Sequence, residues 1–159
     1  MSEVWVARPQ ESGEVTRLLI AFRDWLGESA PDDQAFAASV ALLFADPATE
    51  FLLGTLDGAA APCGVCQLRF RHSVWTSTPD CWLEDLYVEP AGRGQGVGRS
   101  LVVLSFERAS ARGAMRIELD TNEQNRGAVA LYESLGFAAS SKSHGELQGR
   151  DLFMGRRLP

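Results

Sequence analysis

Four glycines at alternate positions, between a proline and an amphipathic segment, are the residues whose spacing points most directly to chemistry. The segment reads Glu89-Pro90-Ala91-Gly92-Arg93-Gly94-Gln95-Gly96-Val97-Gly98-Arg99. Glycine lets the backbone take positive φ angles and approach a ligand closely. The start of a helix presents N–H groups at the positive end of its dipole, and Arg93 and Arg99 add charge. The pattern predicts an anion site suited to phosphate.

Two common phosphate-binding fingerprints do not match this loop. The dinucleotide pattern Gly-x-Gly-x-x-Gly fails in each register, because its third glycine falls on Val97, Arg99 or Leu101. The P-loop pattern fails because no Gly-Lys-Ser/Thr follows the glycines. A glycine turn that only packs a helix against a sheet is therefore the alternative to a phosphate site.

The elements that must position this loop follow from the spacing of apolar residues. A strand over residues 82–88 leads into the loop, and a helix over 98–112 follows it. We expect further strands at 4–8, 51–56, 64–71, 115–120 and 151–158, and further helices at 14–26, 33–44 and 125–135. This order predicts an α/β chain with an antiparallel front half.

Two motifs together resemble the GNAT superfamily of acyl-CoA N-acyltransferases. Arg93-x-x-Gly96-x-Gly98 is similar to the family's (Gln/Arg)-x-x-Gly-x-(Gly/Ala) signature, whose backbone amides bind the pyrophosphate of acetyl-CoA. Asn125-x-x-Ala128-x-x-x-Tyr132-x-x-x-Gly136-Phe137 resembles the family's next motif. The resemblance is strongest over residues 82–137. It implies an α/β GNAT-like fold, with a central mixed, mostly antiparallel twisted sheet flanked by about four helices.

The resemblance also implies acetyl-CoA as co-substrate. Backbone groups near Leu86 and Val88 would bind the pantetheine arm like an added strand, and the Val88 N–H would polarise the thioester carbonyl. Asn125 would contact the CoA chain or cap its own helix. The residues expected at the cofactor are Leu86, Tyr87, Val88, Arg93, Gly94, Gln95, Gly96, Val97, Gly98, Arg99 and Asn125. We expect no metal, because His72 and His144 are too few for a multi-histidine site.

Two side chains are the candidates for acid–base chemistry. The attacking amine must be neutral, although a free alkylammonium has a pKa near ~10, and the departing thiolate should receive a proton. By the same resemblance, Glu84 lies in a segment similar to the one where several small-amine acetyltransferases of the family carry a catalytic glutamate. Strand alternation groups it with Leu86 and Val88 on an apolar face, which suits a base. The alternative is a solvated acid that at most binds a cationic substrate.

Tyr132 is the candidate general acid for the thiolate. It shares one helical stripe with Ala128, Leu131 and Leu135, so the alternative is a core aromatic residue with a bonded hydroxyl.

Two further clusters have plain alternatives. Asp24, Glu28, Asp32 and Asp33, with Trp25 nearby, could attract a cationic acceptor or form a solvated acidic loop. Cys63-x-x-Cys66 has redox spacing but lies in an expected strand, which favours ordinary packing.

Composition excludes several classes of protein. The 159 residues include 15 Lys+Arg and 21 Asp+Glu, a formal net charge of −6, which argues against sequence-independent binding of nucleic acid. No run reaches the ~18 apolar residues of a membrane span, and the N-terminus lacks the pattern of a signal peptide. Three cysteines fit a reducing compartment. We therefore expect one cytoplasmic domain over residues 1–159.

These observations favour an acetyltransferase that moves the acetyl group of acetyl-CoA to a primary amine by direct attack in a ternary complex. The favoured acceptor is a small cationic amine, such as a polyamine, an amino sugar, an aminoglycoside or an amino-acid derivative. A protein N-terminus or lysine is the alternative acceptor. A non-catalytic acyl-CoA-binding module on the same fold is the alternative class. We expect neither a nucleic-acid nor a membrane partner, and a homodimer would agree with the family.

Overall fold

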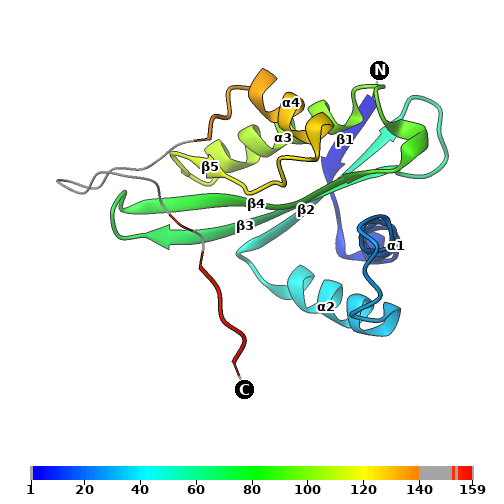
Figure 1. Ribbon diagram of the computed structural model, residues 1–159, viewed down its shortest axis with the longest axis horizontal. Coiled ribbons are helices and arrows are strands. Elements are labelled where there is room, and N and C mark those ends of the chain that lie inside the picture. The colour runs from blue at the N-terminus through cyan, green and yellow to red at the C-terminus, as the bar shows by residue number, and fades with distance from the viewer. Residues whose placement is uncertain (1, 140–151, 153, 159) are drawn as a thin grey trace. The chain divides into compact units, whose positions relative to one another are not determined.

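The computed structural model describes residues 2–139, 152 and 154–158 of the chain. Its contacts divide into two compact units, Met1–Asp120 and Thr121–Pro159. The first unit holds a five-stranded sheet in the order β1-β2-β3-β4-β5 (Figure 1). The strands are β1 Ser2–Val6, β2 Thr49–Leu56, β3 Gly64–Ser73, β4 Thr78–Val88 and β5 Ile117–Glu118. The first four pair antiparallel and β5 runs parallel to β4, so the mixed, mostly antiparallel sheet is confirmed.

Helices of the first unit cover both faces of this sheet. They are α1 Ser12–Trp25, α2 Asp33–Ala45 and α3 Val97–Ala111. Figure 1 shows α1 and α2 on one side of the strands and α3 on the other. Alternation along the strands supplies both cores, because Phe51, Leu53 and Val65 are buried with α1 and α2 whereas Gly54 and Gly64 face α3.

Glycines on two strands let the first turn of α3 approach the sheet closely. A Cβ atom at Gly54 would lie 2.9 Å from Cγ1 of Val97, and one at Gly64 would lie 2.8 Å from the same atom. Val97 is fully buried there. The far end of α3 is held by Arg108 and Arg112, which pair with Glu50 at 2.8 and 2.7 Å. The sheet therefore fixes where the helix, and the glycine loop before it, begins.

One edge of β4 is only partly covered. β5 pairs with β4 at Cys81 and Trp82, and no strand among the described residues pairs with this edge from Leu83 to Val88. On its other edge β4 pairs with β3 through a β-bulge: Gln67 lies opposite Asp85 and Leu68 lies opposite Leu83. Glu84 is thus the extra residue of the bulge, with no residue opposite it.

The second unit holds the helix α4 Arg126–Ser134. The expected strand at 115–120 is only two residues long. The expected closing strand at 151–158 lies partly outside the described residues, and those of its residues that are described form no strand. His144 also lies outside them. No described helix combines the length and apolar composition needed to cross a membrane.

Candidate active site

The open edge of β4 presents backbone groups of alternate residues. The Glu89 N–H donates to the Cys63 carbonyl, on the β3 side, at 2.8 Å. The N–H and C=O of one residue in an extended strand point to the same edge, and those of the next residue point to the opposite edge. The N–H and C=O groups of Val88 and Leu86 therefore face the open side. The Val88 carbonyl accepts a hydrogen bond there from Arg93 Nε at 2.8 Å. An extended ligand could therefore pair with Leu86 and Val88 as an added strand.

The glycine loop leads from this edge into the start of α3. Gly94 and Gly96 have φ angles of 73° and 91°, values that favour glycine. Gly96 is the residue that caps α3, and it brings no side-chain acceptor. The first N–H groups of a helix have no acceptor within it, so those of Gly96, Val97, Gly98 and Arg99 can serve an anion. Gln95 donates from its side-chain amide to the Ala91 carbonyl at 2.7 Å instead.

Two residues expected at the cofactor have roles that the sequence did not indicate. The buried Val97 side chain packs on the sheet, so only its N–H could meet a ligand. The Arg93 guanidinium lies 4.9 Å from the centre of the Trp25 ring and 5.6 Å from that of Tyr87. Together with its bond to the Val88 carbonyl, this contact ties the end of α1 to the end of β4.

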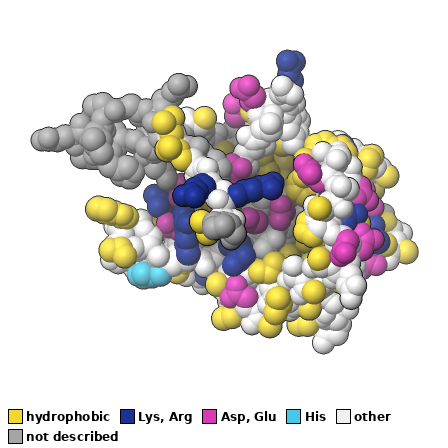
Figure 2. All heavy atoms as spheres, turned by 60° about the horizontal axis from the view of Figure 1, so that its bottom comes forward, with side chains coloured by type: hydrophobic (Ala, Val, Ile, Leu, Met, Phe, Trp, Pro, Cys, Tyr) yellow, Lys and Arg dark blue, Asp and Glu magenta, His cyan; other side chains and the backbone are white. Residues whose placement is uncertain are grey.

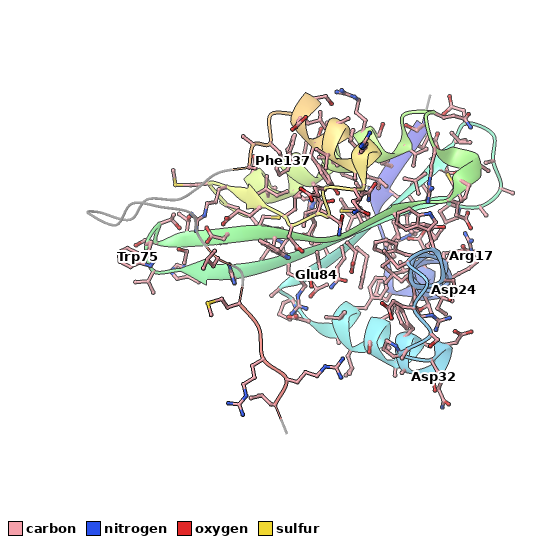
Figure 3. All side chains as sticks on the ribbon, viewed as in Figure 1. Arg17, Asp24, Asp32, Trp75, Glu84 and Phe137 are labelled. Carbon is pink, nitrogen blue, oxygen red and sulfur yellow. The ribbon has the colours of Figure 1, made fainter. Side chains whose placement is uncertain are left out.

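Glu84 does not lie on an apolar face, and that expectation is wrong. Its side chain is exposed on β4 (Figure 3). The bulge between Gln67 and Leu68 explains the difference, because the added residue breaks the simple alternation that grouped Glu84 with Leu86 and Val88.

The carboxylate with a distinctive environment is its neighbour, Asp85, which the sequence analysis did not select. Burial, together with the negative charges of Glu84 and Asp120, raises the pKa of Asp85 to about 6. The signal that could have found Asp85 is its position two residues before Tyr87. Both share a strand face, and the Tyr87 ring stacks on Phe22 of α1 with centroids 5.3 Å apart.

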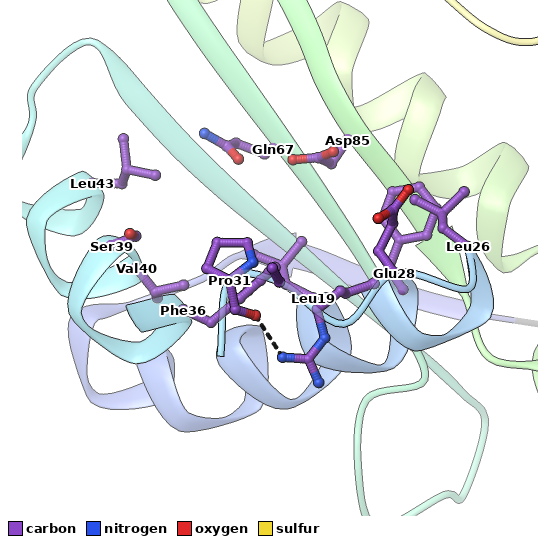
Figure 4. A pocket seen from close by; sticks show the side chains of 13 residues that line it. Leu19, Leu26, Glu28, Pro31, Phe36, Ser39, Val40, Leu43, Gln67 and Asp85 are labelled. Carbon is purple, nitrogen blue, oxygen red and sulfur yellow. Dashed lines mark hydrogen bonds between the residues drawn. The ribbon is translucent and has the colours of Figure 1, made fainter. Parts of the chain in front are cut away.

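Asp85 lines a cavity of about 340 Å³ between α1, α2 and the sheet. In Figure 4 Gln67 and Asp85 lie side by side above it, with Leu43 toward one end and Glu28 toward the other. Gln67 is buried and is the β3 partner of Asp85. The lining residues are Leu19, Phe22, Arg23, Leu26, Glu28, Ala30, Pro31, Phe36, Ser39, Val40, Leu43, Gln67 and Asp85. Apolar walls with few polar groups are typical of a small-molecule site.

The acidic residues near the end of α1 divide into two kinds. Arg23 pairs with Asp24 at 2.7 Å and with Asp33 at 2.8 Å, and Asp32 caps α2 by accepting from the Ala35 N–H. Of the four, only Glu28 lines the cavity. Figure 2, which brings α2 toward the viewer, shows acidic side chains among apolar and basic ones on this surface.

Tyr132 and Asn125 belong to the second unit. Asn125 caps α4, its side chain accepting from the Ala128 N–H at 3.4 Å, and Arg126 is exposed. Tyr132 is buried, and its ring meets the edge of Phe137 with centroids 5.6 Å apart. A backbone bond from the Phe137 N–H to the Tyr132 carbonyl closes the helix end. The packing role of Tyr132 is thus observed, and its role as an acid stays a prediction.

The cysteines have the environment of packing residues. Burial raises the pKa of both the Cys66 and the Cys81 thiols to about 12, which keeps them protonated at neutral pH. Cys63, Cys66 and Cys81 are all free. Within the described ranges, no group of three or more His, Cys, Asp or Glu residues is arranged to hold a metal ion.

Comparison with known proteins identifies the family of this chain. A sequence model of the Acetyltransferase (GNAT) family matches residues 15–137, and the chain therefore belongs to that family. Thialysine N-epsilon-acetyltransferase of Sus scrofa is 33% identical over 95 residues, which cover 57% of this chain and 55% of the relative. Mycothiol acetyltransferase of Beutenbergia cavernae is 38% identical over 68 residues, 41% of this chain and 23% of that one.

The fold agrees as well. An aminoglycoside N-acetyltransferase solved in complex with CoA superposes with a TM-score of 0.76 at 17% identity, over 93% of this chain and 95% of the other. At that identity the likeness concerns the fold alone. The chain spans about half the length of the thialysine acetyltransferases it matches.

Proposed function

We propose that this chain is an acetyl-CoA-dependent N-acetyltransferase that acts on a primary amine. One observation carries the proposal: the open edge of β4 runs from the glycine-capped start of α3 to the strand position of Asp85, which lines the cavity. A site for a phosphate group and a site for an amine are thus connected by backbone groups able to hold an extended arm between them. The family membership supports the same reaction.

Each end of acetyl-CoA has a matching part of the chain. The N–H groups at the start of α3 suit the pyrophosphate, and Leu86 and Val88 suit the amides of the pantetheine arm. The thioester then comes next to Asp85, so we assign the polarising N–H to Leu86, with Val88 bound to the arm. This order refines the expectation that Val88 polarises the carbonyl.

Transfer needs one new bond and one broken bond. The amine nitrogen attacks the thioester carbon, the N–C bond forms, and the carbonyl oxygen becomes an oxyanion that the Leu86 N–H stabilises. The C–S bond then breaks, and the CoA thiolate takes a proton from Tyr132. The nitrogen loses its second proton as the amide forms, and this proton restores the Tyr132 hydroxyl through solvent. Asp85, ionised above pH 6, binds the ammonium and takes its proton. Glu84 is exposed, and we assign it a supporting role through water.

Replacing Tyr132 with Phe is expected to lower kcat about tenfold to thirtyfold while KM for acetyl-CoA stays unchanged, because the ring still packs but no acid serves the thiolate. Steady-state kinetics measure the effect, and a thermal melt checks the fold. A variant that keeps full kcat would return Tyr132 to a purely packing role.

Replacing Glu84 with Gln is expected to lower kcat/KM only about threefold to tenfold, because a hydrated carboxylate interacts weakly with an amine. Steady-state kinetics at several salt concentrations measure it, with the loss shrinking as salt rises. A loss larger than that of the corresponding Asp85 variant would reverse the roles assigned to the two acids.

The function itself is tested by incubating the full chain with acetyl-CoA and a pooled panel of primary amines, with products identified by mass. Mass detection avoids thiol dyes, which could react with the cysteines. The expected result is an amine heavier by one acetyl group at multiple turnovers. Binding of acetyl-CoA with no turnover of any small amine, peptide N-terminus or lysine would favour the acyl-CoA-binding module.

A further inference from the structure

We infer that the acceptor is a primary monoamine on a compact apolar body, and that polyamines and amino sugars are poor acceptors. This inference rests on the proposed function, because it concerns the acceptor cavity of the same site. It narrows the range of cationic amines that the sequence left open.

The size and walls of the cavity support a small apolar body. Its volume of about 340 Å³ lies near the lower end of the range of about 300–1,000 Å³ that is usual for ligand sites. Phe36, Val40 and Leu43 of α2 line it opposite Leu19 and Phe22 of α1. These side chains offer no hydrogen-bond partner, so the hydroxyl groups of a sugar that lie among them would lose their bonds to water without replacement.

The charges of the cavity support a single ammonium group. Asp85 is its carboxylate on the sheet, and Gln67 beside it can accept a further hydrogen bond. Arg23 also lines the cavity, but it pairs with Asp24 and Asp33 and donates to the Pro31 carbonyl at 2.8 Å. The first ammonium group of a diamine would therefore pair with the Asp85 carboxylate. Its second ammonium group, directed toward Phe36, Val40 and Leu43, would be buried with no carboxylate beside it.

Glu28 is a second carboxylate that lines the cavity, and it could bind the other ammonium group of a diamine. It is exposed and lies on the segment after α1, toward the end of the cavity away from Leu43 in Figure 4. A diamine could bind only by turning its second ammonium to that end, where water and salt weaken the attraction. The apolar end would then stay empty, which loses the larger share of the contact area.

The test compares two amines of equal length on the same chain, pentylamine and 1,4-diaminobutane, which differ only in whether the far end carries a methyl or an ammonium group. We expect kcat/KM to be at least about tenfold higher for pentylamine. Glucosamine should be poorer still. Equal or higher kcat/KM for the diamine would overturn the inference and leave the transferase function standing, whereas no acetylation of any amine would remove the function itself.

A matched pair of variants on α2 tests whether the apolar wall of the cavity sets the preference for a monoamine over a diamine. Leu43→Glu places a carboxylate in the cavity and should reverse the ratio of the two kcat/KM values. Leu42→Glu is the control, because Leu42 is 74% exposed and does not line the cavity, and its ratio should match that of the parent. Ser39→Asp, at an exposed lining position, repeats the test if Leu43→Glu does not fold. An unchanged ratio in a folded cavity variant would overturn the inference.

Discussion

Replacing Asp85 with Asn should lower kcat/KM at least about a hundredfold while making the protein more stable at pH 7. The activity falls because an amide can neither neutralise an ammonium group nor take its proton. The stability rises because the folded chain holds a half-buried charge at pH 7 that the amide lacks. If both effects are observed, the burial of Asp85 aids the reaction and lowers the stability of the fold.

The sign of the stability effect follows from the pKa. In the folded chain the pKa of Asp85 is raised from 3.8 to about 6, so between these values the folded state binds more protons than the unfolded state. Stability is therefore lost as pH rises through this window, and the penalty is complete above pH 6. A shift of about two units corresponds to about 1–3 kcal/mol of unfolding free energy, which Asp85→Asn should recover.

Urea unfolding at pH 4 and at pH 7 measures this difference. Asp85→Asn should gain more over the parent at pH 7 than at pH 4, and Glu84→Gln, an exposed neighbour, should change unfolding by less than about 0.5 kcal/mol at either pH. The parent's kcat/KM should also rise with pH through about 6. A destabilised Asp85→Asn at pH 7, or a flat rate profile across pH 5–7, would contradict the assignment.

Replacing Gly64 with Ala should destabilise the fold by about 1–3 kcal/mol and weaken acetyl-CoA binding about tenfold. The new Cβ would lie 2.8 Å from Val97 Cγ1 and 3.0 Å from Leu101 Cδ1, so the first turn of α3 must move off the sheet. Because the same turn presents the N–H groups expected at the pyrophosphate, packing and binding should be lost together.

Calorimetry of acetyl-CoA binding and urea unfolding measure the two losses. The double variant Gly64→Ala with Val97→Ala should recover part of both, since the smaller side chain makes room for the new methyl group. Gly13→Ala is the matched control, because nothing lies within 4 Å of a Cβ there. If Gly64→Ala lost stability but bound acetyl-CoA as well as the parent, the binding site for the anion would not depend on the position of the first turn of α3.

Much of the fold was predictable from local patterns. Apolar spacing gave the helices and the antiparallel strands, and the positive φ angles of Gly94 and Gly96 agree with a glycine loop at a helix start. These features depend on residues close together in the sequence. The family resemblance over residues 82–137 could be recognised for the same reason, because both motifs are local, and the match to the family model confirmed it.

The proposed acceptor side was less predictable because it depends on pairing between distant segments. The bulge that exposes Glu84 arises from the register of Gln67 and Leu68 on β3, which the pattern of β4 alone does not contain. The cavity walls come from α1 and α2, far from either motif. Arg93 could be recognised as a loop cation, but its contact with Trp25 requires the end of α1 to lie beside it.

The two-residue length of β5 sets how much of the β4 edge is left for a ligand. Because β5 ends at Glu118, the β4 edge beyond Trp82 stays available over roughly 17–20 Å at about 3.3 Å per residue. Under the proposed function, the arm of the acyl carrier lies on the part of this edge from Leu86 to Val88, and its anion lies beyond Val88 at the start of α3. A short acyl phosphate could not reach from the start of α3 to Leu86, so a donor with a long arm requires that β5 stop before this part of the edge.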